Sequence, residues 1–317
     1  MKRMKAAGPA LDGAASIGKP ANSAWPSASL VGDVPALLAD RAAASVDLVV
    51  MAAPQAVRAS GRANEIDPDQ YVEWFLPLSA QLLRVLSPRG SFVLNIKEAV
   101  IDGERHTYVF ELILALRKQG WLWCEEYGWH KGRGTQTSSA QRLPDAWERC
   151  LHFTKQRAFK MNQDAVQVPM GTWAQSRLKS LSKSDEVRMN SAVGNAFGKR
   201  VGAWVGRSHA YPTNVLHPAQ TDEWSCAGMG LTPDVARWFI KLFSDVGDVV
   251  LDPFAMSSVT TDAAEALGRC GIGLAPERKR VRPAGSRRLD GQAPVAVAAA
   301  GSVVVVGRGS FSAKSGA

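Results

Sequence analysis

Two turns that follow apolar runs carry the residues of this chain best placed to do chemistry. Val46–Val50 leads into Ala52-Ala-Pro-Gln55, and Asp248–Leu251 leads into Asp252-Pro-Phe254. Short β-branched runs of this kind predict buried parallel strands. The first turn offers backbone carbonyl oxygens as hydrogen-bond acceptors, and the second adds a carboxylate. Taken singly, each turn also fits a structural role, because Asp252 would lie near the N-terminus of the following helix.

The middle of the chain is rich in cations, as in segments that bind a polyanion. Residues 117–207 hold 16 Lys and Arg against 7 Asp and Glu, in a chain whose net charge is +9. Aromatic residues are interleaved with these cations, namely Trp129, Phe159, Trp173 and Trp204. Cations at phosphates give affinity and salt dependence, whereas a few groups in a groove would read sequence. The segment therefore predicts a polyanionic partner.

Several classes of protein are disfavoured by the sequence. No run of about 18 apolar residues is present, so no membrane span is expected. The first 29 residues lack the apolar core of a secretory signal and are interpreted as a disordered leader. The four cysteines form no C-x-x-C pair, which predicts reduced thiols in a cytoplasmic protein and no metal site. No G-x-G-x-x-G follows a strand, which disfavours a nicotinamide enzyme.

The apolar spacing predicts that strands and helices alternate along the chain. Helices are expected at residues 36–44, 68–86, 108–119, 233–243 and 260–268. Strands are expected at residues 46–50, 91–96, 121–129, 248–251 and 270–273. Alternation of this kind predicts an α/β fold with a doubly wound, mostly parallel sheet. From Lys131 the periodicity is lost, which indicates an inserted module.

Both turns resemble motifs of the DNA amino-methyltransferases. The family's catalytic loop reads Ser-Pro-Pro-Tyr or Asp-Pro-Pro-Tyr, which is similar to Ala52–Gln55. Its cofactor loop reads Asp-Pro-Phe-x-Gly-Ser-Gly-Thr-Thr, which is similar to Asp252–Thr261. The order of catalytic loop, recognition segment and cofactor loop is that of the β class, a circular permutation of the methyltransferase fold. Further similar stretches are Tyr71–Leu76, Gly90–Lys97, Asp145–Arg149, Tyr211–Pro218 and Trp238–Phe243.

The resemblance implies a reaction and its partners. A methyl group would pass from S-adenosylmethionine to the exocyclic amine of a base extruded from double-stranded DNA. Cytosine-N4 is favoured as the target, with adenine-N6 next. A bacterial or phage-borne cytoplasmic enzyme of a restriction–modification system is implied, with a cognate restriction endonuclease as a further partner. No oligomeric state follows.

The resemblance also assigns residues to roles. The catalytic positions are Ala52, Ala53, Pro54 and Gln55. The cofactor-binding positions are Asp33, Asp252, Pro253, Phe254, Ser257, Thr260, Thr261 and Ala275. The positions expected to contact DNA are Lys131, Arg133, Arg142 and Arg149. No metal ligand is expected.

The same resemblance divides the chain into five parts. Residues 1–29 are the leader, 30–129 the catalytic half, 130–210 the target-recognition segment, 211–277 the cofactor-binding half, and 278–317 a low-complexity basic tail.

Several expected side chains are replaced. Ala52 lacks the polar group and Gln55 lacks the aromatic ring of the family loop, while Met256 and Ser258 stand where the family has glycine. Ala275 occupies the place of an acid that would hold the ribose. These replacements predict an impaired enzyme, and the alternative is a catalytically inactive, DNA-binding remnant. Either reading requires Pro54 and Asp252 to lie at the same edge of the sheet.

Overall fold

The fold is seen in a computed structural model that describes residues 29–58, 66–135, 140–180, 183, 206–217 and 230–276. The predicted leader, apart from Ser29, and the predicted tail lie outside the described residues. Within the described ranges, no helix combines the length and the apolar character that crossing a membrane requires.

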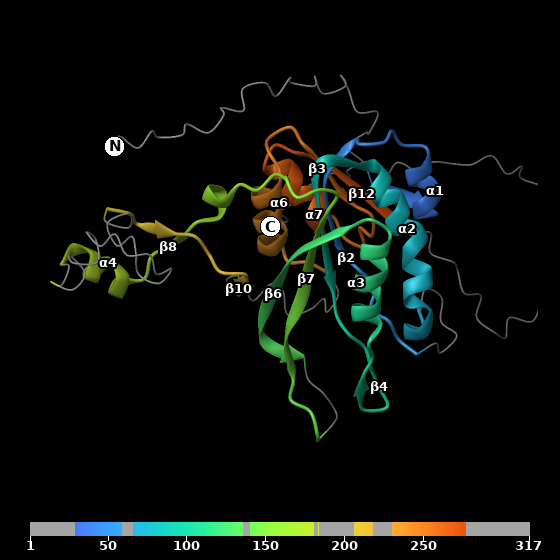
Figure 1. Cartoon of the computed structure of the whole chain (residues 1–317), viewed down its shortest axis with the longest axis horizontal. Helices are drawn as coiled ribbons and strands as arrows, with labels where there is room; N and C mark the ends of the chain where they lie inside the picture. The colour runs from blue at the N-terminus through green and yellow to red at the C-terminus, as the bar shows by residue number, and fades with distance from the viewer. Residues whose placement is uncertain are drawn as a thin grey trace, which may run out of the picture.

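An eight-stranded sheet forms the centre of the described structure, in the order β1-β12-β11-β2-β3-β7-β6-β10 (Figure 1). The strands are β1 (Ser29–Gly32), β2 (Val46–Ala52), β3 (Leu86–Ile96), β6 (Leu122–Thr135), β7 (Asp145–Thr154), β10 (Val215–Leu216), β11 (Val249–Asp252) and β12 (Cys270–Pro276). Only β7 runs antiparallel to its neighbours in this sheet. The predicted α/β class with a mostly parallel sheet is confirmed.

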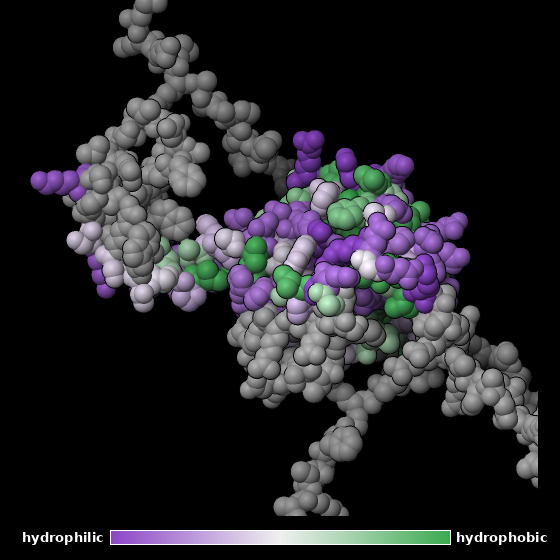
Figure 2. Space-filling view, turned by 90° about the horizontal axis from the view of Figure 1, so that it is seen from below, coloured by the Kyte–Doolittle hydropathy of each residue, from purple (hydrophilic) through white to green (hydrophobic). Residues whose placement is uncertain are grey.

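Helices cover both faces of the sheet, which makes three layers (Figure 1). One face packs against α1 (Val34–Ala39), α2 (Tyr71–Val85) and α3 (Tyr108–Lys118). The other face packs against α6 (Pro233–Phe243) and α7 (Val259–Ala266). The remaining elements are η1 (Pro68–Gln70), β4 (Val100–Ile101), β5 (Glu104–Arg105), η2 (Gln163–Val166), β8 (Val168–Pro169), α4 (Thr172–Lys179) and β9 (His209–Ala210). The face seen in Figure 2 is mainly hydrophilic, with apolar side chains scattered among polar ones.

Strand β2 shows why the sequence has an unbroken apolar run here. Val49 and Met51 belong to the core under α1–α3, whereas Leu48 and Val50 belong to the core under α6 and α7. All four side chains are fully buried. Successive residues of a strand point to opposite faces, so a strand covered on both faces needs apolar residues at every position.

Strand β3 begins earlier than predicted. The expected helix over residues 68–86 is η1 followed by α2, and β3 starts at Leu86 instead of Ser91. Ser87 precedes Pro88, and a residue in that place favours extended backbone. Gly90 allows close pairing with β2, because a Cβ there would lie 2.7 Å from the Asp47 carbonyl oxygen. Pro88-Arg-Gly90 therefore continues the strand instead of forming a separate turn.

Part of the expected recognition segment belongs to the sheet. β6 continues to Thr135, which pairs with Asp145, and β7 lies between β3 and β6. The division expected at residue 130 therefore runs through β6. Figure 1 shows the β6–β7 hairpin extending past the sheet body, with α4 and β8 set apart from it.

A buried histidine connects the sheet to α6. His152 in β7 is 1% exposed, and its ring stacks on Phe243 with a centroid distance of 4.2 Å. Its Nε2 atom lies 2.9 Å from the Ser91 hydroxyl oxygen. Burial lowers the pKa of His152 to about 3, because the charged imidazolium would lose its hydration.

The protein should lose stability in acid through His152. The unfolded chain binds a proton near pH 6.5, whereas the folded imidazole stays neutral until about pH 3. The stability from the neutral, buried imidazole is therefore fully present above pH 6.5. It falls by up to roughly 5 kcal/mol as the pH drops from 6.5 to about 3, because the unfolded chain binds a proton that the folded chain does not. His152→Gln should flatten the dependence of the urea-unfolding free energy on pH between 6.5 and 4. The exposed His209→Gln is the matched control, and an equal slope in both variants would contradict the argument.

Candidate functional site

The two turns meet at one edge of the sheet. β2 and β11 pair in parallel, with Leu48 opposite Val250 and Val49 opposite Leu251. The carboxyl ends of parallel neighbours lie side by side, so Ala52–Gln55 and the residues after Asp252 face the same space. Both turns line one cavity of about 600 Å³. Pro54 and Asp252 therefore lie at the same end of the sheet, as the sequence predicted.

The turn after β2 is fixed through its backbone. The Ala53 amide donates to the Asn95 carbonyl oxygen at 2.9 Å, and the Tyr71 hydroxyl donates to the Pro54 carbonyl oxygen at 2.8 Å. Tyr71 is fully buried in α2, so this donor is held in place. All four predicted catalytic positions line the cavity, and Gln55 is the most exposed of them. The scaffold of the loop is present although its polar side chain and aromatic ring are absent.

The turn after β11 is built around a buried carboxyl group. Asp252 is 6% exposed and accepts a hydrogen bond from the Phe254 amide at 3.0 Å, with a second from Thr260. Burial raises the pKa of Asp252 to about 7 despite these two bonds. Phe254 lies edge-on to Trp74 of α2 at a centroid distance of 5.6 Å. The carboxyl group thus orders its own turn at the cavity wall.

The structure brings most of the predicted cofactor positions together. Those that line the cavity are Asp33, Asp252, Phe254, Ser257 and Thr260. Pro253 and Thr261 are buried behind the wall, where the Thr261 hydroxyl donates to the Ser258 carbonyl oxygen at 2.9 Å. Ala275 does not line the cavity, although its neighbour Pro276 does. Glu277 lies outside the described residues.

The turn after β11 is unstrained at Met256 and Ser258, the two positions where the resemblance expects glycine. Ser258 has a φ of −80°, and Met256 is absent from the described residues that have positive φ. Met256 stands at the cavity rim and is 54% exposed, so its side chain does not fill the space. Glycine is required instead at Gly271, where a Cβ would lie 2.7 Å from the Thr261 carbonyl oxygen. The turn therefore tolerates side chains where the resemblance expects glycine.

Three polar residues of the cavity were not predicted from the sequence. Asn95 lies near the carboxyl end of β3, Lys97 directly follows that strand, and Glu148 belongs to β7. All three lie in stretches that resemble the family, namely Gly90–Lys97 and Asp145–Arg149, but the resemblance gives them no role. Asn95 could have been found from its place at the carboxyl end of the strand after β2. Glu148 had no such signal, because only the sheet order places β7 beside β3.

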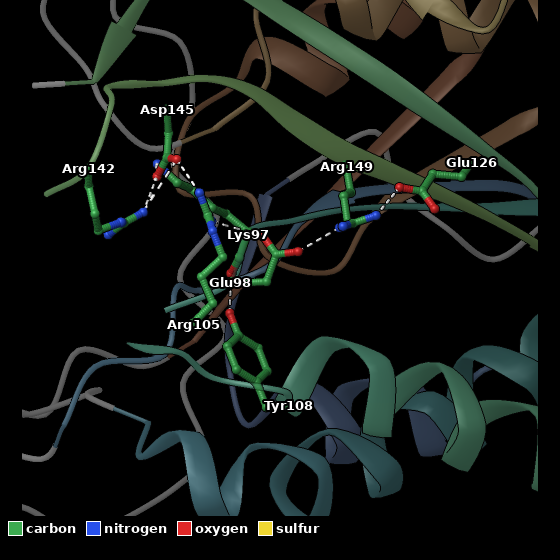
Figure 3. Close-up of polar contacts among 8 residues, drawn as sticks. All are labelled: Lys97, Glu98, Arg105, Tyr108, Glu126, Arg142, Asp145 and Arg149. Carbon is green, nitrogen blue, oxygen red and sulfur yellow. Dashed lines mark hydrogen bonds and ion pairs between the residues drawn. The ribbon is translucent and has the colours of Figure 1, made fainter. Parts of the chain in front are cut away.

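The cations expected to contact DNA have partners inside the chain. Lys131 pairs with Glu148, and Arg142 lies 3.4 Å from Asp145. Arg149 pairs with Glu98 at 2.7 Å and also with Glu126. Figure 3 shows Arg149 between the two glutamates, with Asp145 meeting three cations from different segments. The side chain of Arg133, in β6, lies outside the described part. The DNA role of these four residues stays a prediction.

Comparison with known proteins decides the family. A family model described as DNA methylase matches residues 46–284, about three quarters of the chain and both turns of the cavity. The chain belongs to the DNA methylase family. This agrees with the family that the motifs indicated.

The relatives of this DNA methylase include two type II methyltransferases. M.BglII of Bacillus subtilis is 26% identical over 261 residues, which cover 79% of this chain and 65% of that protein. M.PvuII of Proteus hauseri is 23% identical over 296 residues, which cover 86% of each chain. The solved structure of the cytosine-N4-specific PvuII DNA methyltransferase matches with a TM-score of 0.57 and 19% identity, over 79% of this chain and 82% of that one. The structural match shows a shared fold.

Removing the Tyr71 hydroxyl should loosen the turn after β2. Tyr71→Phe keeps the buried ring and deletes the donor to the Pro54 carbonyl oxygen. One lost hydrogen bond of this kind costs about 1 kcal/mol. Urea unfolding should show that loss, and hydrogen exchange should speed up in residues 52–55. The control is Tyr211→Phe, which deletes an exposed hydroxyl bonded to Asp164. Equal exchange in both variants would contradict the role given to Tyr71.

Arg149 should prove essential to the fold whatever its part in DNA binding. Its side chain is 17% exposed, and Glu98 is 10% exposed. Arg149→Met would leave the buried Glu98 carboxylate with the more distant Arg105, at 3.8 Å, as its ion-pair partner. Breaking a buried pair in this way costs up to about 3–5 kcal/mol. Urea unfolding measures the loss. Arg237→Met, which removes an exposed pair with Asp234, should cost less than about 1 kcal/mol.

Proposed function

We propose that this protein is a site-specific DNA methyltransferase, with cytosine-N4 as the favoured target and adenine-N6 as the second choice. One observation carries the proposal, namely the single cavity shared by the turns after β2 and β11. A methyl donor and an extruded base must meet within bonding distance, so their two binding loops must open into one space. The family assignment and the type II relatives support the same reaction.

S-adenosylmethionine is the proposed methyl donor, and the cavity suits a ligand of that size. Ligand sites of about 300–1,000 Å³ are common, and this cavity measures about 600 Å³. Asp33, Phe254, Ser257 and Thr260 would hold the donor, which supplies an activated methyl group. Phe254 offers an apolar surface, while Ser257 and Thr260 offer hydroxyl groups. Asp252 acts behind them by fixing the Phe254 amide and the turn.

The base would enter beside the turn after β2. Backbone carbonyl oxygens of this turn can accept hydrogen bonds from the exocyclic amine, which makes its nitrogen more tetrahedral and more nucleophilic. The Pro54 oxygen already accepts from Tyr71, which positions the turn. Gln55 offers no aromatic face, and base stacking on such a ring is worth about 1–3 kcal/mol. We infer a rate roughly tenfold to a hundredfold below that of a relative with the ring.

Double-stranded DNA is the proposed partner, with a cognate restriction endonuclease in the same system. The surplus of cations in residues 117–207 supports a salt-dependent interaction. The order of the two turns along the chain supports assignment to the β class. The alternative function is a DNA-binding remnant without catalysis, and it is favoured by one observation. The side chains lost from the cavity are those expected to touch the base.

Calorimetry with S-adenosylmethionine, followed by transfer of radiolabelled methyl groups to duplex DNA, tests the proposed function. Cofactor binding and slow transfer are expected, with N4-methylcytosine as the modified nucleoside. N6-methyladenine would favour the second target. Salt-sensitive DNA binding with neither cofactor binding nor transfer would reject the enzyme and favour the remnant.

Restoring the family residues should raise the transfer rate. The variant combines Ala52→Ser, Ala53→Pro and Gln55→Tyr with Met256→Gly and Ser258→Gly. Proline at position 53 lacks the amide that donates to the Asn95 carbonyl oxygen, so a second variant keeps Ala53. We expect a gain of roughly tenfold to a hundredfold in single-turnover transfer, mainly from the aromatic ring. The three changes after β2 should supply most of it, because the turn after β11 is unstrained without glycine. Gln70→Tyr, at an exposed position away from the cavity, is the control. An unchanged rate would count against these positions.

A further inference from the structure

The sheet register places two polar side chains beside the altered catalytic turn. Ala52 in β2 lies opposite Asn95 in β3, and Asn95 lies opposite Cys150 in β7. Glu148 stands two residues before Cys150, so it points to the same face of the sheet. Asn95 and Glu148 both line the cavity with Ala52. A carboxylate two strands away therefore lines the same cavity as the position where the resemblance expects Ser or Asp.

Contacts from two neighbours hold the Glu148 carboxylate in place. The Lys131 ammonium group pairs with its Oε1 atom, and the Asn95 Nδ2 atom donates to its Oε2 atom at 3.3 Å. Lys131 also lies 4.5 Å above the centre of the Trp129 ring. The Glu148 side chain is 12% exposed, and burying a carboxylate to this extent is costly unless it is paired and hydrogen-bonded. A carboxylate has about four acceptor positions, so these two contacts leave room for another donor.

The cations of a niche next to Glu148 pair with other carboxylates. A niche next to the cavity is lined by Lys97, Glu98, Arg105, Asp145, Trp147, Glu148 and Arg149. In it, Lys97 and Arg105 pair with Asp145, and Arg149 pairs with Glu98 (Figure 3). The cations nearest to Glu148 on that side therefore already have carboxylate partners. Asn95 is fixed too, because its Nδ2 atom also donates to the Arg149 carbonyl oxygen at 3.1 Å.

We propose that Glu148 recognises the exocyclic amine of the target base, in place of the polar side chain absent at Ala52. The proposal rests on the proposed function. A carboxylate accepts hydrogen bonds and donates none, so it selects a base edge that presents N–H groups. Cytosine N4 and adenine N6 present such an edge, whereas thymine presents a carbonyl oxygen there. Accepting from the amine also draws its hydrogens out of the ring plane, which favours attack by nitrogen.

Binding of nucleosides to the full chain tests Glu148 without turnover. The probes are deoxycytidine and N4,N4-dimethyldeoxycytidine, which has no N–H to donate, and ligand-observed NMR gives the ratio of their dissociation constants. The unsubstituted protein should prefer deoxycytidine at least about tenfold. Glu148→Gln keeps an uncharged acceptor and should reduce the preference several-fold, because charged acceptors bond about twice as strongly. Glu148→Met should abolish the preference.

The control variant is Glu126→Gln. It removes a carboxylate partner of Arg149 in the same sheet without touching the cavity, and it should keep the full preference. Thermal unfolding of each variant shows whether the fold is intact. Glu148→Gln serves as the deciding variant if Glu148→Met does not fold. A preference that is absent in the unsubstituted protein, or unchanged in folded Glu148 variants, overturns the proposal.

The two proposals fail in different ways. Cofactor binding and methyl transfer without any nucleoside preference would reject the role of Glu148 and retain the enzyme. A preference that depends on Glu148, with neither cofactor binding nor methyl transfer, would reject the enzyme and retain a site for an amine-bearing base.

Discussion

The parallel pairing of β2 with β11 is the constraint on which the rest of this structure depends. It brings the turns at Pro54 and Asp252 to one edge, although most of the chain separates them. The Asp47 carboxylate strengthens the pairing by accepting a hydrogen bond from the Val249 amide at 3.0 Å. Apolar side chains on both faces of β2 fix its register, because a shift by one residue would exchange the faces that they pack against. The cavity exists because this pairing is fixed.

The conformation of the turn after β2 depends on its backbone and not on the side chains of Ala52 and Gln55. Tyr71 holds the turn through the Pro54 carbonyl oxygen, a main-chain group that any residue possesses, and the Ala53 amide adds a bond to the Asn95 carbonyl oxygen that any residue except proline can make. Such a scaffold survives replacement of the side chains at Ala52 and Gln55, whereas recognition of a base by those side chains does not. The proposal for Glu148 assigns that recognition to a carboxylate on β7, two strands away from β2, which lines the same cavity.

Some of the cations of this chain have carboxylate partners within it. The side chains of Lys131, Arg142 and Arg149 contact carboxylates of the same chain. They raise the net charge without being available at full strength to phosphates. The composition counts cations that pair with carboxylates of the chain together with cations that do not. A surplus of positive charge therefore indicates a polyanionic partner but does not say which side chains contact it.

The sequence by itself determined the layers and the location of the two turns. Short β-branched runs such as Val46–Val50 predict buried strands, and their alternation with helices leaves few topologies. It misjudged where β3 begins and assigned no role to Glu148. Only the tertiary structure decided that β7 inserts between β3 and β6, which carries Glu148 to the cavity and gives Arg149 its glutamate partners. Side-chain partners across strands depend on sheet order and register, and local sequence preferences contain neither.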